Sequence, residues 1–336
     1  MMRAVLVGAG GMGQAWARNL TANPNVELAG WVDVRQGAAL EAAKANNLDV
    51  AVTGTDLQQV LDKAKPDFVV DVTSPDAHRD VVVAALNAGF PVIGEKPMAA
   101  SIEQAREMVA ASEKAGKLYM VSQSRRYETG ITAYRKLIRE RLGPLGIVNV
   151  DFYIGAHFGG FRDEMDSPLV LDMAIHTFDQ ARFLTGADPV SVYAEEFNPS
   201  WSWYKGDACA TALFEMSDGL RFCYRGSWCA DGGHTSWEGE WRAVSGNGTA
   251  LWPGHGSPKA YVVQSQEGFH PPTETFEGPL QEVPSGIAGS LAEFLTALET
   301  GSTPQGECHD NFKSLAMVFG VIESNRQGRR VPIERL

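Results

Sequence analysis

A glycine-rich run near the start of the chain has the spacing of a phosphate-binding loop. Gly8, Gly10 and Gly13 stand in the pattern G-x-G-x-x-G, and Gly11 and Met12 fill the positions before the third glycine. In such a loop the first glycine permits a tight turn, the second lets a pyrophosphate approach the backbone, and the third lets helix pack on strand. The N–H groups and positive dipole end of the following helix then face the phosphates. The run therefore predicts a dinucleotide site.

An acidic residue follows this loop at the distance expected for cofactor selection. Asp33 ends the second predicted strand, twenty residues after Gly13. A carboxylate at this place accepts hydrogen bonds from the adenosine ribose hydroxyls and repels a 2′-phosphate, so we expect NAD. Arg35, two residues further on, could soften this preference, which leaves NADP as the alternative cofactor.

Three further side chains are of types that could transfer a proton or stabilise the negative charge that develops on an alcohol oxygen. Asp172 and His176 are four residues apart in a predicted helix, so they share one face and can interact. An imidazole titrates near neutral pH and suits a base that takes a proton from an alcohol. A lysine such as Lys96 could stabilise developing alkoxide charge. For His176 alone, a structural role on a half-buried helix is the simpler interpretation.

The elements of the first 120 or so residues follow the alternation of a parallel sheet, in which short β-branched runs separate helical stretches. Ser101 and Gln104 form a capping box, and Gly116 stands where that helix should end. Asp76 is expected to cap the preceding helix and Gly89 to terminate it. We expect strands at residues 4–7, 26–33, 50–53, 68–72, 91–94 and 118–123.

The pattern changes near residue 145, where residues 147–154 alternate between apolar and polar. Further strands are expected at 208–216, 220–228, 241–244 and 260–264, and helices at 170–184, 290–298 and 311–325. Because no crossover helices separate the later strands, they should form an antiparallel sheet. The stretch 246–284 reads as loops around a strand or two. We predict an α/β protein with domains at 1–123 and 124–336.

Composition excludes several classes of partner. The 336 residues carry a formal net charge of −12, which argues against a nucleic-acid polymer as partner. No apolar segment approaches the roughly 18 residues of a membrane span, and no secretory signal is evident, so we expect a cytoplasmic protein without membrane contact. The cysteines show no C-x-x-C pair. Isolated histidines lack metal-ligand spacing, so no metal is expected; they are His234, His255, His270 and His309.

Two more motifs point to a known family. Gly94-Glu95-Lys96-Pro97 follows the fifth predicted strand, and Asp172-x-x-x-His176-x-x-Asp179 lies in the first helix of the second domain. With the N-terminal loop, with Thr73-Ser74-Pro75-x-x-His78 and with the closing Glu323-Ser324-x-x-x-Gly328-Arg329-Arg330-Val331, they resemble the glucose–fructose oxidoreductase / inositol dehydrogenase (Gfo/Idh/MocA) family. The resemblance covers essentially the whole chain.

This resemblance implies an NAD(P)-dependent oxidoreductase that acts on a secondary alcohol or ketone of a sugar, cyclitol or related polyol. It implies an N-terminal Rossmann domain, an open-faced and mainly antiparallel C-terminal sheet, and a homodimer or homotetramer formed through that sheet. By position, it makes His176 the general acid/base, Asp172 its orienting partner and Lys96 the group that stabilises the alkoxide. The cofactor contacts that it implies are Thr73, Ser74, Pro75, His78, Glu95 and Lys96.

The substrate side departs from the family pattern. Family members commonly have a glycine-rich approach to the aspartate and a glycine inside the motif, whereas Ala174 occupies the inner position here. Ser124 and Arg125 match pocket-lining positions of inositol dehydrogenases, and His157 and Arg162 are weaker candidates of the same kind. Six of the eight tryptophans lie in residues 201–252 and suit either sugar stacking or packing of the sheet and subunits.

Two other functions share the same fold. Some relatives cleave glycosides by transient oxidation and elimination with NAD kept as a bound catalyst, and another acts as a non-catalytic sensor. Retention of lysine, aspartate and histidine together argues against the sensor, because a pure binder does not need them.

Overall fold

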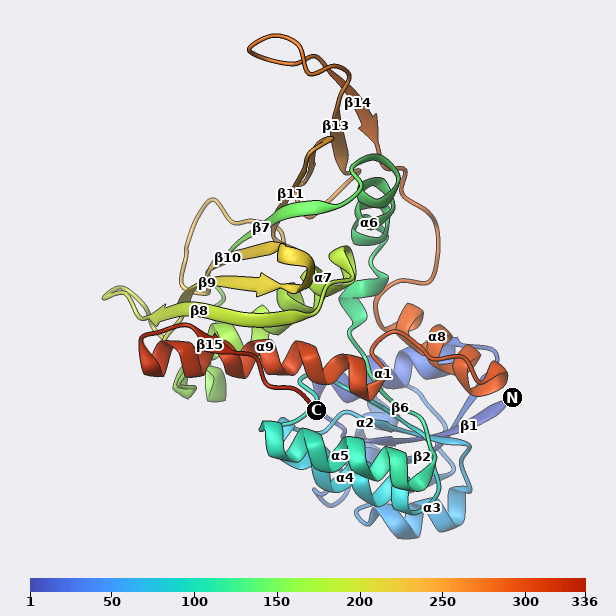
Figure 1. The fold of residues 1–336 in the computed structure, drawn as a ribbon. Coiled ribbons are helices and arrows are strands. Elements are labelled where there is room, and N and C mark those ends of the chain that lie inside the picture. The colour runs from blue at the N-terminus through green and yellow to red at the C-terminus, as the bar shows by residue number, and fades with distance from the viewer. The chain divides into compact units, whose positions relative to one another are not determined.

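The computed structural model describes all 336 residues and forms two compact units. The first unit contains Met1–Ser124, Ile287–Phe312 and Leu336, and the second contains Arg125–Gly286 and Lys313–Arg335. The return of Ile287–Phe312 to the first unit differs from the predicted division, which left all residues from 124 onward in the second domain. Figure 1 shows the chain coloured from its N-terminus to its C-terminus.

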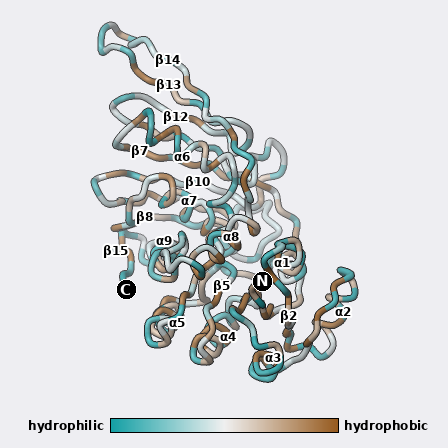
Figure 2. Tube along the Cα trace, turned by 90° about the vertical axis from the view of Figure 1, so that its right-hand side faces the viewer, coloured by the Kyte–Doolittle hydropathy of each residue, from teal (hydrophilic) through white to brown (hydrophobic).

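The first unit is built on a six-stranded sheet in which every strand pair is parallel. The expected strands are confirmed as β1 (Met2–Val7), β2 (Val26–Val32), β3 (Val52–Gly54), β4 (Phe68–Asp71), β5 (Val92–Gly94) and β6 (Tyr119–Val121). Their order is β3-β2-β1-β4-β5-β6, so the order reverses between β1 and β4. Ligands of doubly wound folds bind at such a reversal, outside the carboxyl ends of the strands. Apolar residues run along β2 and β5, as the brown segments of Figure 2 show.

Helices connect these strands, and their ends test the predicted caps. The Ser101 hydroxyl accepts a hydrogen bond from the Gln104 amide at 3.2 Å, and Gly116 ends the helix at φ +59°, as predicted. The predicted Asp76 cap is wrong: Ser74 is the N-cap, because proline at the next position is preorganised for the first helical turn. The helices are α1 (Gly11–Ala22), α2 (Ala38–Ala45), α3 (Leu57–Ala64), α4 (Pro75–Asn87), α5 (Ile102–Ala115), α8 (Gly286–Thr300) and the start of α9 (Cys308–Gln327).

The second unit contains a nine-stranded sheet, ordered β14-β13-β12-β11-β7-β10-β9-β8-β15. Its strands are β7 (Leu145–Tyr153), β8 (Pro189–Phe197), β9 (Cys209–Met216), β10 (Arg221–Ser227), β11 (Glu240–Ser245), β12 (Gly248–Trp252), β13 (Lys259–Val263), β14 (Thr273–Glu277) and β15 (Val331–Pro332). The mainly antiparallel character is confirmed, with one correction, since β7 and β10 pair in parallel. β7 and β10 are far apart in the sequence, and the local alternation of apolar and polar residues does not predict which strands pair. No helix of the chain is both long and apolar enough to cross a bilayer.

One face of this sheet is covered and the other is open. The helices α6 (Thr129–Arg141) and α7 (Ile175–Thr185) pack on the covered face, and α7 presents Phe178 to a buried aromatic cluster. The Phe178 ring lies 5.0 Å from Phe214 and 5.2 Å from Tyr224 between ring centroids. On the open face a hollow of about 580 Å³ is lined by polar side chains such as Asp151 and Arg225. The covered face therefore holds the core that positions α7.

A buried carboxyl on β8 predicts a pH-dependent stability. Burial raises the pKa of Glu196 to about 7, although a hydrogen bond from Ser167 opposes the rise and Asp207 adds to it. Since the folded-state pKa lies above the ordinary value of 4.5, folding stability falls as pH rises from 4.5 to about 7 and then stays constant with respect to this group. Glu196→Gln should therefore stabilise the protein at pH 8 by about 1–3 kcal/mol and have little effect at pH 4.5.

Urea unfolding at the two pH values measures this effect. Glu195→Gln is the matched control, because Glu195 is the exposed neighbour on the same strand. An equal gain from both substitutions, or a gain that is independent of pH, would contradict the assignment.

Candidate active site

The glycine loop lies at the carboxyl end of β1, where the strand order reverses. Gly8 has φ +105°, and a Cβ there would meet the Val72 carbonyl oxygen at 2.4 Å. A Cβ on Gly13 would lie 2.1 Å from the Gly8 carbonyl oxygen, so only glycine lets α1 approach the strand this closely. Gly10 and Gly11, by contrast, face open space, and α1 has no side-chain cap. The first helical N–H groups are thus left for an external acceptor, which fits the pyrophosphate of a dinucleotide.

Asp33 is held in place beside this loop. Its carboxylate accepts the Ala9 amide at 2.8 Å, the Arg35 amide at 2.9 Å and the Arg35 Nε at 3.0 Å. Burial raises the pKa of Asp33, but hydrogen bonds from Arg35 and Ala9 lower it by more, so the carboxylate stays ionised. The Arg35 side chain itself is exposed. Asp33 therefore presents a fixed negative charge at the end of β2.

The segment after β4 is fixed by a buried ion pair. His78 Nδ1 lies 2.7 Å from an Asp71 carboxylate oxygen, and the Thr73 hydroxyl donates to the other oxygen at 2.7 Å. Burial lowers the pKa of His78, but the Asp71 carboxylate raises it by more, so the net shift is upward. His78 is 1% exposed and faces Asp71. The geometry gives His78 a role in holding the Thr73–Pro75 turn, while its direct cofactor contact stays a prediction.

Lys96 follows β5 and is preceded by a buried carboxylate. Glu95 accepts the Trp16 indole N–H at 2.7 Å and the Lys96 amide at 3.1 Å. Burial raises the pKa of Glu95, against the lowering effect of Trp16 and Lys96. The Lys96–Pro97 peptide is cis. Trp16 and Asp71 are neighbours of the candidate site that the sequence did not predict, since each is an ordinary core position until the fold brings it to Glu95 or His78.

In the second unit, Asp172 and His176 straddle a change in helix type. Asp172 lies in a π-helical turn at Leu169–Ala174, and His176 lies in the first turn of α7. Such π-helical turns are rare and occur frequently at functional sites. Asp172 accepts the Arg162 Nε at 2.5 Å, whereas His176 is 7% exposed. The four-residue spacing keeps both side chains on neighbouring parts of one helical surface.

Arg162 connects Asp172 to a group of aromatic rings. Its guanidinium lies 5.0 Å from the Phe158 ring centroid and 4.7 Å from that of Phe161. Both phenylalanines are exposed. His157 stacks on Trp203 with centroids 3.6 Å apart and lies 3.2 Å from Asp231.

Arg125 lies in the same unit and approaches the helix of Asp172. It pairs with Glu238 at 3.2 Å, donates to the Trp237 carbonyl and lies 3.7 Å from Met173 Sδ. Burial lowers the pKa of Arg125, and the neighbouring carboxylates oppose this effect. Ser124, the other predicted residue of this pair, is the last residue of the continuous stretch that opens the first unit.

The tryptophans divide into packed and exposed positions. Trp228, Trp241 and Trp252 are buried in the second unit, which favours the packing interpretation for these three. Trp237 is 46% exposed, lies 6.2 Å from Phe158 and belongs to the loop that Arg125 holds. Trp237 therefore combines an exposed ring with neighbours among the predicted site residues.

Asp179, the last residue of the motif, has a structural role. Its carboxylate forms a bidentate pair with Arg126, both contacts at 2.6 Å, and accepts the Ser314 hydroxyl at 2.7 Å. Arg182 also donates to Ser314. These buried groups connect α7, which carries His176, to the turn that precedes α6 and to α9. The buried position of Arg126 was not predicted, because an arginine next to another arginine in the sequence is expected to lie on the surface.

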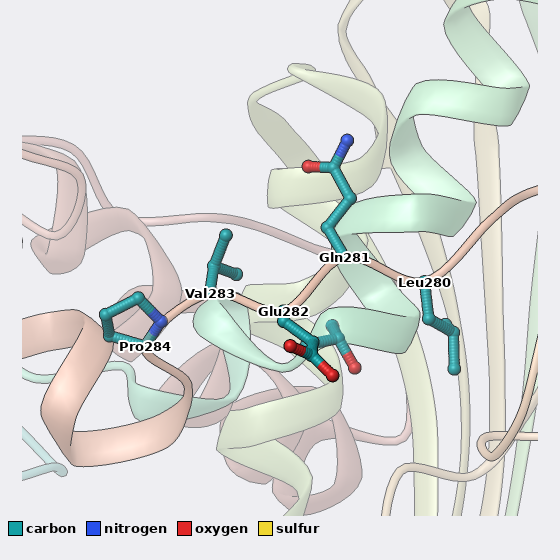
Figure 3. A pocket seen from close by; sticks show the side chains of 6 residues that line it. Leu280, Gln281, Glu282, Val283 and Pro284 are labelled. Carbon is teal, nitrogen blue, oxygen red and sulfur yellow. The ribbon is translucent and has the colours of Figure 1, made fainter.

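A second surface pocket is lined by none of these residues. It measures about 760 Å³ and is lined by Thr129 and by the segment 280–284. Figure 3 shows these side chains along an irregular stretch of chain, with Glu282 as the single charged group. None of the predicted site residues lines it, and its chemistry offers no pair for acid–base work.

Both units of the chain match models of one known family. Residues 2–123 match the model of the oxidoreductase family with an NAD-binding Rossmann fold, Gfo/Idh/MocA. Residues 131–250 match the C-terminal domain model of the same family. The chain belongs to the Gfo/Idh/MocA family. It is an NAD-binding oxidoreductase, which agrees with the loop and the strand order described above.

Individual relatives extend over most of the chain. It is 25% identical to an inositol 2-dehydrogenase of Rhizobium meliloti, covering 98% of both chains, and 26% identical to a D-apiose dehydrogenase of Paraburkholderia graminis, covering 84% of this chain and 76% of the other. Among solved structures, an Agrobacterium radiobacter oxidoreductase in complex with NAD+, L-tartaric acid and magnesium superimposes with a TM-score of 0.88 at 21% identity, covering 98% of both chains. That likeness confirms the fold.

Proposed function

We propose that the protein is a dehydrogenase or reductase that transfers a hydride between NAD and a secondary alcohol or ketone of a sugar, cyclitol or related polyol. The observation that carries the proposal is the placement of Asp172 and His176 at the π-to-α junction, because a carboxylate and a nearly buried imidazole lie four residues apart along one helical segment there. Both residues occupy the motif positions that the family resemblance predicts. NAD, when bound, supplies the hydride acceptor or donor.

The protein's own groups carry the remaining chemistry. The glycine amides and the start of α1 bind the pyrophosphate, and the Thr73–Pro75 turn, held by Asp71 and His78, lies at the adjacent strand end. His176 takes the hydroxyl proton during oxidation and returns it during reduction. Asp172 orients the imidazole, while Arg162 keeps the Asp172 carboxylate in place. Lys96 stabilises the alkoxide.

The aromatic group around Arg162 supports a polyol substrate. Phe158, Phe161 and Trp237 are exposed rings that can cover the C–H face of a sugar or cyclitol. Arg125 and Arg162 supply donors for hydroxyl oxygens. The names of the inositol and D-apiose dehydrogenase relatives agree with this substrate class.

A substrate panel tests the proposal. Inositols, aldoses, ketoses and aldonates would each be incubated with NAD or NADP while NADH or NADPH absorbance is followed. We expect reduction of NAD by at least one polyol. Sugar release from a glycoside without net NADH would instead indicate the hydrolase, and tight NAD binding without turnover across the panel would indicate a sensor.

We further propose that Asp33 selects NAD over NADP. Asp33→Ser removes the charge that repels a 2′-phosphate and the acceptor for the ribose hydroxyls. It should weaken NAD binding by about 10–100-fold, since hydrogen bonds to charged groups contribute about 1.5–3 kcal/mol. NADP binding should improve. Titration of intrinsic tryptophan fluorescence with each cofactor measures both effects.

Asp80→Ser is the control for this change, because it removes one exposed carboxylate from the same unit. An unchanged ratio of NAD to NADP affinity in Asp33→Ser would show that Asp33 does not select the cofactor.

The open face of the nine-stranded sheet is our proposed contact with a second copy of the chain. Tyr193, Leu213, Cys223 and Asn149 align across four adjacent strands on this face, and the first two are exposed apolar side chains. Light scattering after size-exclusion chromatography should report a dimer or tetramer. Leu213→Asp should shift it toward the monomer, and an unshifted assembly would place the contact elsewhere.

A further inference from the structure

Three consecutive residues outside the residues proposed for catalysis bring metal-binding atoms together. Glu307, Cys308 and His309 stand at the start of α9, within the first unit. Cys308 Sγ lies 2.9 Å from Glu307 Oε1 and 3.6 Å from His309 Nδ1, and His309 Nδ1 lies 2.7 Å from the same Glu307 oxygen. All three ligand atoms fall within 4.8 Å of one another. Sulfur, imidazole nitrogen and carboxylate oxygen are the donors that zinc takes in proteins.

The backbone holds this cluster independently of the three side chains. Glu307 forms an antiparallel bridge with Met120, and the Val121 amide donates to the Gly306 carbonyl at 2.8 Å, so the turn is fixed to β6. The Glu307 carbonyl accepts the Asn311 amide at 2.9 Å, which sets the first turn of α9. The donor atoms are therefore carried by an ordered edge of the parallel sheet.

A fourth residue supplies the support that metal-binding histidines usually have. His309 Nε2 lies 2.9 Å from a Glu113 carboxylate oxygen on α5. Histidine ligands commonly donate their second ring N–H to a carboxylate, which fixes the tautomer and makes the other nitrogen the ligand. Here that arrangement leaves Nδ1 directed toward Glu307 and Cys308. Glu113 is distant in sequence, so spacing along the chain does not reveal it.

We propose that Glu307, Cys308 and His309 bind a divalent zinc-like cation, with Glu113 as the carboxylate partner of the histidine. Tetrahedral zinc with bonds of about 2.0–2.3 Å places neighbouring ligand atoms about 3.3–3.7 Å apart. The sulfur–nitrogen distance already has this value, and the two distances to Glu307 need to open by roughly half an ångström.

Charge and access also agree with this site. On binding, the Cys308 thiol and His309 Nδ1 each release their proton, and one thiolate and one carboxylate then balance the two positive charges of the ion. Cys308 is fully buried, whereas the His309 side chain is 45% exposed, so the ion has a route in and water can take a fourth position. A bound ion would link α5 to the start of α9 and to the edge of β6. The site does not rest on the proposed function.

The test is titration of untagged full-length protein, dialysed against a chelator, with Co²⁺ and then Zn²⁺. Thiolate ligation of Co²⁺ gives a charge-transfer band in the near ultraviolet, and a tetrahedral site gives visible d–d bands. We expect one equivalent to bind and Zn²⁺ to displace it. Cys308→Ser should abolish the charge-transfer band, and Glu113→Gln should weaken binding by about 10–100-fold, as loss of such supporting carboxylates does.

Cys223→Ser is the matched control, because it removes a half-buried cysteine of the second unit and should leave the band unchanged. Circular dichroism of each variant establishes that it is folded, and Glu113→Gln keeps the test decisive if Cys308→Ser does not fold. Absence of stoichiometric binding, or a thiolate band that survives Cys308→Ser, would overturn the proposal and leave a proton-bridged hydrogen-bond network at this place.

Discussion

His176→Asn should lower kcat by about 10³-fold, because the variant retains a hydrogen-bonding side chain but no group that titrates near neutral pH. NAD affinity should remain within a few-fold of wild type, since the described cofactor loop belongs to the first unit and His176 to the second. Stopped-flow or steady-state absorbance of NADH gives kcat, and fluorescence titration gives the affinity.

Lys96→Met extends the same test to the group proposed to stabilise the alkoxide. A loss of about 10²–10³-fold in kcat is expected, the size found when one oxyanion-stabilising donor is removed. Lys117→Met, which removes an exposed lysine of the same unit, is the control. If either His176→Asn or Lys96→Met kept wild-type turnover, its assigned role would be wrong. Equal loss of NAD binding would instead indicate either that Lys96 mainly contacts the cofactor or that the substitution disturbs the cofactor loop.

Asp179→Leu should be the most destabilising single substitution proposed for the second unit. It removes the carboxylate that pairs with buried Arg126 and accepts from Ser314, and thereby leaves the guanidinium buried without its partner. Breaking a buried pair in this way costs about 3–5 kcal/mol. Urea unfolding followed by circular dichroism should therefore show a marked fall in the midpoint of the second unit's transition.

Two further variants make this result specific. Asp179→Leu combined with Arg126→Met should recover most of the loss, because an apolar pair can replace a buried ion pair. Glu277→Ala breaks the exposed pair with Lys259 and should leave the midpoint nearly unchanged. A double variant as unstable as Asp179→Leu would show that packing around α7, not the unpaired charge, dominates.

The parallel sheet was predictable from sequence because its strands are short, mostly buried and separated by helices whose ends carry recognisable capping residues. The second unit was harder. The strands β8 and β15 were not predicted, and the stretch 246–284 holds three strands, β12, β13 and β14, where a strand or two was expected. The helix α6 was not predicted either, although Ile131, Tyr134 and Leu137 carry a helical period. In β8 the two glutamates obscure the alternation, because Glu196 points inward against the usual rule. The parallel pairing of β7 with β10 depends on strands distant in sequence.

The candidate site was predictable where a local motif carries the chemistry. The glycine loop, Asp33 and the Asp172–His176 spacing can each be read within a few residues. Contacts that join distant segments could not be read in this way, among them Trp16 with Glu95, Arg162 with Asp172 and Glu113 with His309. The sequence placed His309 among the histidines without metal-ligand spacing, because its carboxylate partner Glu113 lies on another helix.

The first unit is discontinuous along the chain, and this bears on how the protein is made. Phe68 on β4 is fully buried and meets Phe294 of α8 with ring centroids 5.4 Å apart. During synthesis, residues 1–124 leave the ribosome long before α8 has been made. We therefore expect the apolar surface around Phe68 to stay exposed to solvent until the segment that ends at residue 312 has emerged. We expect a fragment ending near residue 124 to aggregate, and a shortened chain in which 287–312 is joined directly to residue 124 to fold as an independent NAD-binding unit.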